Sequence, residues 1–385
     1  MDTTYIFLQH YWWFLVSLLG ALFVFLMFVQ GGQTLIYTLG KSEDEKTLII
    51  NTLGRKWEFT FTTLVTFGGA FFASFPLFYS TSFGGAYWVW MAILLCFVVQ
   101  AVAYEYRTKA NNFLGKKTYE IFLLINGFGA TVLVGTAVGT LFTGANFSVN
   151  FSNLTNLGGN LTISEWHHPF NGLEAVWENP LNITLGLAVF FLARILGALY
   201  IINSVDNDNI LQRTQKRLLY DVVPFLVFFL TFVICLLLKT GVLYDAGGNC
   251  KPEEYKYLKN FLQMPAILVT FLVGVVCVLW GTGKTVFSKP VYSKGIWFAG
   301  TGTVLTVLAL LLTAGYNNTA YYPSNVDINS SLTIVNSSSS KFTLTAMSIV
   351  SIAIVFVLAY IFYFWRVMNR KKMTVEEIKS ESHTY

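Results

Sequence analysis

Nine apolar stretches, each long enough to cross a lipid bilayer as a helix, constrain this chain more than any other feature. A membrane-spanning helix needs about 20 mainly apolar residues, and in lipid a helix satisfies its own backbone hydrogen bonds. We therefore expect an all-α integral membrane protein with one transmembrane domain, residues 1–366, and a tail, residues 367–385. The predicted spans are residues 12–39, 59–80, 86–104, 120–142, 181–203, 219–240, 264–281, 295–315 and 344–365.

The basic residues predict how these helices are oriented. Only 12% of the 385 residues are charged, whereas soluble proteins average about 25%. Most Lys and Arg residues lie in alternate connecting segments, and cytoplasmic loops are the ones enriched in these residues. The N-terminus is thus predicted outside and the C-terminus in the cytoplasm. The net charge of +5 suggests attraction to membrane lipid headgroups, and no motif indicates a nucleic-acid partner. The basic segments are residues 41–56, 107–117, 213–217, 284–294 and 366–379.

Charged groups at the membrane edge are the candidate functional residues. Glu58 opens the second span, and Glu105 and Lys109 close the third on the same predicted cytoplasmic side. An acid in partly dehydrated surroundings is paired, protonated or part of a proton route. These residues could pass protons inward through water; the alternative is an ordinary ion-pair cluster at headgroup level.

Arg194 is a separate candidate, because it lies midway along the fifth span with no acid in that span. A charge at that depth pairs within the membrane, with another helix or a partner chain, or faces water.

The histidines argue against a haem or metal ligated by this chain alone. They are His10, the His167–His168 pair in a predicted outer loop, and His383 in the tail, so no span carries one in its middle. Haem in membrane bundles is usually held by His or Met from inside the bundle. The exposed His167–His168 pair is interpreted as solvated rather than metal-binding.

Several motifs resemble subunit II of cytochrome bd-type quinol oxidases, and the similarity runs from end to end. In that family the resemblance implies a heterodimer of two nine-helix subunits in the bacterial inner membrane, which oxidises quinol and reduces oxygen to water. The motifs are Trp12-Trp13, WE at 57–58, GGAFFASFP at 68–76, FGGAYW at 83–88, YEYRTK at 104–109, Asn179-Pro180, GALY at 197–200, PSNVDINSSLTIVNSSSSKFTL at 323–344 and the His-Thr-Tyr terminus.

The resemblance also implies how the work is divided between subunits. The haem-bearing subunit I would carry two b-type haems, one d-type haem and the quinol site, while subunit II supports it and shapes proton and oxygen access. By motif position, Glu58, Glu105, Lys109 and Tyr385 would form the proton route. A small accessory subunit and a structural quinone or lipid in subunit II are left open.

One departure from the family pattern lies in the first span. Gln30 and Gln33 stand where many members carry the two acids of an Asp-Gly-Phe-Asp motif. A charge-dependent role at this place would be lost, or replaced by neutral hydrogen bonding.

Two other functions remain open at this point. In a secondary transporter or channel, Arg194 and Glu58 would line a solute path, but such proteins often show repeated halves and matching broken helices, and no internal repeat is visible. A purely structural scaffold would differ from an oxidase subunit only if Glu58 and Glu105 proved dispensable.

Overall fold

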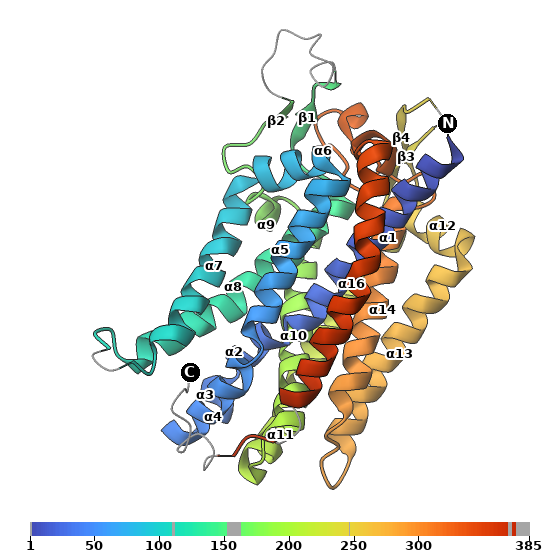
Figure 1. Ribbon diagram of the computed structural model, residues 1–385. Coiled ribbons are helices and arrows are strands. Elements are labelled where there is room, and N and C mark those ends of the chain that lie inside the picture. Colours follow the sequence, from blue (N-terminus) through green and yellow to red (C-terminus); the bar gives the residue numbers. More distant parts are fainter. Residues whose placement is uncertain (1, 110–111, 152–162, 246, 369–371, 375–385) are drawn as a thin grey trace.

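The computed structural model describes residues 2–109, 112–151, 163–245, 247–368 and 372–374 as a bundle of long helices with two small β-hairpins at one end (Figure 1). We call that end the hairpin end. The long helices are α1 (Thr3–Leu26), α5 (Trp57–Ser74), α7 (Tyr87–Tyr106), α8 (Lys116–Thr143), α10 (Pro180–Ser204), α11 (Asp208–Leu238), α13 (Pro265–Phe287), α14 (Gly295–Gly315) and α16 (Lys341–Met368). The shorter elements are α2 (Phe28–Gln33), α3 (Ile36–Leu39), α4 (Glu43–Gly54), α6 (Pro76–Phe78), η1 (Tyr79–Gly85), β1 (Phe147–Val149), β2 (Ser164–Trp166), α9 (Ala175–Glu178), β3 (Gly241–Tyr244), β4 (Cys250–Glu253), α12 (Lys256–Gln263), η3 (Ile328–Ser330) and α15 (Ile334–Ser337).

The helices confirm an all-α integral membrane protein. In the described part of the chain, seven helical segments are long and apolar enough to cross a membrane, and an eighth is added if the bent segment through α5 and α6 counts as one span. The ninth predicted span falls on α16. The number nine and the side that faces the cytoplasm remain predictions.

Two predicted spans differ from the helices that occupy them. The first span begins earlier, at Thr3, and its helix is interrupted at Met27 before α2 continues the same span up to Gln33. The second does not run straight to residue 80, because the helix ends at Ser74 and the chain bends by 120° before Pro76. Proline has no N–H for the helix ladder and is favoured at a helix start.

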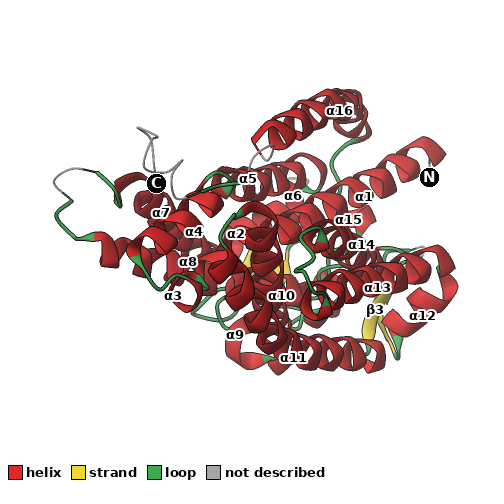
Figure 2. Ribbon diagram, turned by 90° about the horizontal axis from the view of Figure 1, so that it is seen from below, coloured by secondary structure: helices red, strands yellow, loops and turns green. Residues whose placement is uncertain are grey.

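Helix α10 lies inside the bundle, with α11 and α16 on its outside (Figure 2). Small residues let α10 approach α2 closely. A Cβ atom built on Gly197 would lie 2.4 Å from the backbone N of Gly32, and one on Gly31 would overlap the backbone of Ala193. Such small-residue contacts are a common means of helix packing within lipid.

Two long loops, one between α8 and α10 and one between α14 and α16, pack against each other at the hairpin end. Residues 145 and 324 form a parallel bridge, the Ser330 hydroxyl accepts the Val149 N–H at 3.0 Å, and the ring of Phe147 stacks on Tyr322 at 4.9 Å. Asp2, at the start of the chain, pairs with Lys341 at the start of α16. Near the other end of the described chain, Met373 donates its N–H to the Ser204 carbonyl, at the end of the bundle opposite the hairpins.

Candidate functional site

Three of the four predicted proton-route residues, Glu58, Glu105 and Lys109, lie at the end of the bundle opposite the hairpins (Figure 1). The rings of Trp57 and Tyr104 stack with centroids 5.9 Å apart, which places the start of α5 beside the end of α7. Glu58 and Glu105 directly follow these two rings in the chain, so both acids lie on one rim. Glu58 is in the first turn of α5, where the helix dipole favours a negative charge.

On that rim the side chains of Glu58, Glu105 and Lys109 face outward. Glu58 is exposed, and Glu105 and Lys109 form an ion pair at 3.1 Å with about half of each side chain exposed (59% and 48%). Exposed pairs of this kind contribute little to stability, roughly 0–1 kcal/mol. In the described part of the chain, no hydrogen bond or ion pair joins Glu58 to Glu105 or Lys109. Tyr385 lies outside the described residues.

A line of hydroxyl groups continues from Glu58 along the exposed face of α5. Thr62 and Thr66 follow at four-residue steps, and both are exposed. The Thr62 hydroxyl donates to the Glu58 carbonyl, and the Thr66 hydroxyl to the Thr62 carbonyl, each at 2.7 Å. Eight residues of helix span about 12 Å, so this hydroxyl line (Glu58, Thr62 and Thr66) reaches well into the bilayer. Because the donor protons are used inside the helix, the oxygen lone pairs are free to accept from water or a partner.

The YEYRTK motif also supplies a residue that turns inward. Arg107 is 1% exposed, and its Nη2 atom lies 2.8 Å from Oε1 of Glu120 in α8, which is 2% exposed. Lys46 of α4 lies 3.9 Å from the other Glu120 oxygen, so this buried group joins α4, α7 and α8. Sequence reasoning passed over Glu120, although its place at the first position of the predicted fourth span was the available signal.

Arg194 pairs across the bundle with α11. Its Nε atom donates to Asp221 Oδ1 at 2.9 Å, and Asp221 is fully buried. Arg194 also donates to the Thr34 hydroxyl at 2.7 Å, while Arg217 lies 3.5 Å from Asp221. Sequence reasoning missed Asp221. The available signal was an acid at the third position of the predicted sixth span, because charged residues inside a span need a partner.

Gln30 and Gln33 are both fully buried on α2 and make neutral hydrogen bonds to α7. The Gln30 amide donates to Gln100 at 3.3 Å, and the Gln33 amide donates to the Tyr104 hydroxyl at 3.1 Å. Nearby, the Asn126 side chain of α8 is fully buried and makes no hydrogen bond within the described residues. This part of the bundle is therefore polar yet uncharged. Because Tyr104 also stacks on Trp57, it connects this interior to the rim.

Comparison with known proteins assigns the chain to a family. The sequence profile described as cytochrome bd terminal oxidase subunit II matches residues 8–368. The chain is 26% identical to cytochrome bd-I ubiquinol oxidase subunit 2 of Escherichia coli K12, over 98% of each chain. It is 28% identical to a probable cytochrome oxidase subunit 2 of Haemophilus influenzae, over 92% of this chain and 93% of that protein.

A solved structure has the same fold. A chain of the bd oxidase from Geobacillus thermodenitrificans superposes with a TM-score of 0.65 at 13% identity, over 95% of this chain and 99% of that chain. At such low identity the likeness establishes the fold alone. Because the family profile extends over nearly the whole sequence, the chain belongs to the cytochrome bd terminal oxidase subunit II family.

Proposed function

We propose that this chain is the haem-free subunit of its oxidase, supporting the haem-bearing subunit I and lining a proton route from the cytoplasm to it. Family membership makes the chain a subunit of a bd-type quinol oxidase, an oxidoreductase complex of the bacterial inner membrane that contains haem and a subunit I. Membership also sets aside the transporter or channel alternative. The E. coli relative is a subunit of a ubiquinol oxidase, which supports a quinol as the electron donor here.

The described histidines of this chain are not placed to hold a haem within the membrane. His10 lies near the hairpin end of α1 with its Nδ1 atom 2.9 Å from the Ile6 carbonyl. His167 bonds the Ser148 hydroxyl at 2.8 Å, and His168 lies in the same loop region. Within the described residues, no histidine stands in the middle of a spanning helix, where an axial ligand from facing helices would have to be. We therefore place the two b-type haems and the d-type haem on subunit I.

The exposure of the hydroxyl line carries the proton-route proposal. An acid followed by two hydroxyl groups on the outside of a membrane helix would be costly against lipid. The cost disappears if another protein chain and ordered water cover this face. Glu58 would then collect protons at the rim, the Glu105–Lys109 pair would set the local charge, and the hydroxyl line would hold water along the subunit boundary. Tyr385 belongs to the proposal through its place in the family motif.

An apolar cavity supports a structural quinone tail or lipid chain in this subunit. The cavity measures about 170 Å³ and lies between α1, α10, α11, α13 and α14. Its walls are apolar, formed by side chains such as Leu185, Phe225 and Phe229. Thr303 and Thr306 also line it, but their hydroxyl groups donate to carbonyls of their own helix. Such a lining suits a hydrocarbon chain rather than a polar headgroup.

The test is Glu58→Gln in the assembled complex, with quinol-dependent oxygen uptake measured from about pH 6 to pH 8. We expect turnover to fall roughly tenfold because the amide cannot take up and release a proton. The fall should be steepest at high pH, where protons are scarce, and the reduced-minus-oxidised haem spectrum should stay intact. The matched control is Glu254→Gln, an exposed acid near the hairpin end. Unchanged turnover at every pH would remove Glu58 from the route.

A further inference from the structure

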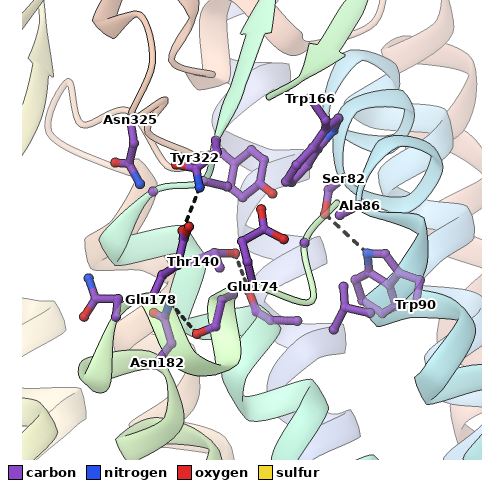
Figure 3. Close-up of a pocket in the computed structure, with 18 residues that line it drawn as sticks. Ser82, Ala86, Trp90, Thr140, Trp166, Glu174, Glu178, Asn182, Tyr322 and Asn325 are labelled. Carbon is purple, nitrogen blue, oxygen red and sulfur yellow. Dashed lines mark hydrogen bonds between the residues drawn. The ribbon is translucent and has the colours of Figure 1, made fainter. Parts of the chain in front are cut away.

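We propose that a pocket at the hairpin end binds a primary ammonium group through the buried carboxylate of Glu174. The pocket has a volume of about 150 Å³ and lies where the ends of α7, α8 and α10 meet the packed loops. Figure 3 shows the Glu174 carboxyl group between the rings of Tyr322 and Trp166. Neither the oxidase chemistry nor the proton route uses this pocket, which lies at the opposite end of the bundle from Glu58.

Glu174 is buried with one oxygen of its carboxylate unpaired, although the backbone N–H groups of Gly172 and Glu174 lie close to the carboxyl group. The residue is 2% exposed, and its Oε2 atom accepts no hydrogen bond within the described residues. The ring of His168 is near, with Nδ1 3.7 Å from that oxygen. However, Nδ1 already accepts the Phe170 N–H at 3.2 Å, so in this geometry it cannot donate to Glu174. A buried carboxylate that lacks a counter-charge is unfavourable, and one remedy is a cation from solution.

The charge of the walls favours a cation. Glu174 and Glu178 both line the pocket, and no Lys or Arg is among the lining residues. Glu178 accepts a hydrogen bond from the Asn146 amide at 2.6 Å and lies 3.8 Å from His168 Nε2. The amide side chains of Asn182 and Asn325 also line the pocket. The site therefore offers carboxylate and amide oxygens to a positively charged guest.

The size and the aromatic walls indicate an organic ammonium group rather than a bare metal ion. The volume equals that of about five water molecules in the liquid, too much space for one ion held directly by protein oxygens. Among the described residues, no group of three or more His, Cys, Asp or Glu side chains is arranged to hold a metal. The rings of Trp90, Trp166 and Tyr322 line the pocket, and aromatic rings attract ammonium groups that reach their faces. The three N–H donors of a primary ammonium group match the carboxylate and its neighbours.

Two sources can supply this chemistry: a free amine, or the ethanolamine headgroup of a membrane lipid. Phe170 and Trp177, beside the pocket, are about half exposed (49% and 54%). Trp is enriched at the membrane–water interface, so Trp177 places the pocket where a lipid headgroup can reach it as readily as a dissolved amine can. Both sources present the same ammonium group to Glu174.

The experiment measures binding of ethanolamine hydrochloride to the purified, delipidated oxidase complex by calorimetry at constant ionic strength. We expect saturable binding to the wild type and at least tenfold weaker binding to Glu174→Gln. The control Glu165→Gln alters an exposed acid on the neighbouring strand β2 and should bind like the wild type. The haem content of each preparation shows whether the variant complex has assembled. A loss of binding at normal haem content is then not caused by misfolding.

A lipid arm separates the two sources. The complex is placed in nanodiscs with or without phosphatidylethanolamine, and retained lipid is measured by mass spectrometry. If phosphatidylethanolamine blocks ethanolamine binding and its retention depends on Glu174, the guest is a lipid headgroup; if ethanolamine binds equally in both nanodiscs, it is a free amine. Absence of saturable binding, unchanged binding to Glu174→Gln, or equal displacement by KCl would each overturn the proposal.

Discussion

The buried pair of Arg194 and Asp221 predicts a stability effect at the scale of single residues. Replacing Asp221 with Asn leaves the Arg194 charge without its 2.9 Å partner. Breaking a buried pair on one side typically costs about 3–5 kcal/mol, so we expect a marked drop in the apparent unfolding temperature of the complex. The control is Asp245→Asn, which breaks the exposed Asp245–Lys251 pair at 3.7 Å and should cost less than about 1 kcal/mol. Equal losses in the two variants would contradict a stabilising role for the buried pair.

Glu174 predicts a pH effect at the scale of one residue. Burial raises its pKa above the ordinary carboxyl value; nearby Glu178 acts in the same direction, while His168 and backbone N–H groups oppose it. Tyr322 is a further titratable group that faces the Glu174 carboxyl group. With a raised pKa, the folded protein holds the proton more tightly than the unfolded chain does, so the stabilisation is lost as pH rises from about 4.5 through the raised value.

The check is to compare apparent unfolding temperatures of wild type and Glu174→Gln across that pH range, without added amine. The amide cannot ionise, so the unfolding temperature of the variant should rise relative to that of the wild type as pH rises. Added ethanolamine should reduce this difference in unfolding temperature at high pH, because it binds the ionised carboxylate of the wild type. A difference independent of pH would show that Glu174 does not change its protonation in the folded protein.

Among the helices, the contact between α2 and α10 depends on the absence of side chains. In Gly197→Ala the new methyl group would meet the Gly32 backbone and the Phe28 carbonyl within 2.7 Å. Overpacking of this kind costs about 1–3 kcal/mol, and we expect less assembled complex together with a lower unfolding temperature. Gly283→Ala in α13 is the matched control, because a Cβ there meets nothing within 4 Å. Tolerance of both variants would mean that α2 and α10 can separate without loss.

Helix α5 carries a prediction about its hydroxyl line. Thr62→Val with Thr66→Val keeps the side-chain shape but removes both oxygens that could hold water beside Glu58. We expect oxygen uptake to fall severalfold while haem content is unchanged, because a proton route needs a continuous set of acceptors. Thr270→Val is the control, since its exposed hydroxyl makes the same backbone bond, to Ala266 at 2.8 Å, on α13. A double variant with full activity would move the route away from this face.

For the molecule as a whole, the lack of a mid-span histidine in the described bundle predicts the behaviour of the isolated chain. Expressed without subunit I, it should insert into the membrane and bind no stoichiometric haem. The measurement is a reduced-minus-oxidised spectrum of the purified chain, with the assembled complex as the positive control. A full haem spectrum from the isolated chain would overturn the placement of the haems on subunit I.

Some features of the fold and the candidate site could be predicted from the sequence, and others could not. Long apolar stretches predicted the fold class because a stretch of about 20 apolar residues crosses lipid as a helix, which satisfies its own backbone hydrogen bonds. They did not predict the break at Met27 or the 120° bend before Pro76, since mean apolarity does not report local direction. The shared rim of Glu58 and Glu105 was predictable, because helices joined by a short connection pack as antiparallel neighbours.

The sequence by itself therefore determined which segments enter the membrane, which family the chain resembles, and at which end the candidate charges lie. Only the tertiary structure decided which partner each charge has: Asp221 for Arg194 and Glu120 for Arg107. It also decided that two distant loops meet to enclose Glu174. The physical reason is that apolarity and helix periodicity are local properties of the chain. Side-chain pairing instead depends on helix rotation and packing, which residues far apart in the sequence set together.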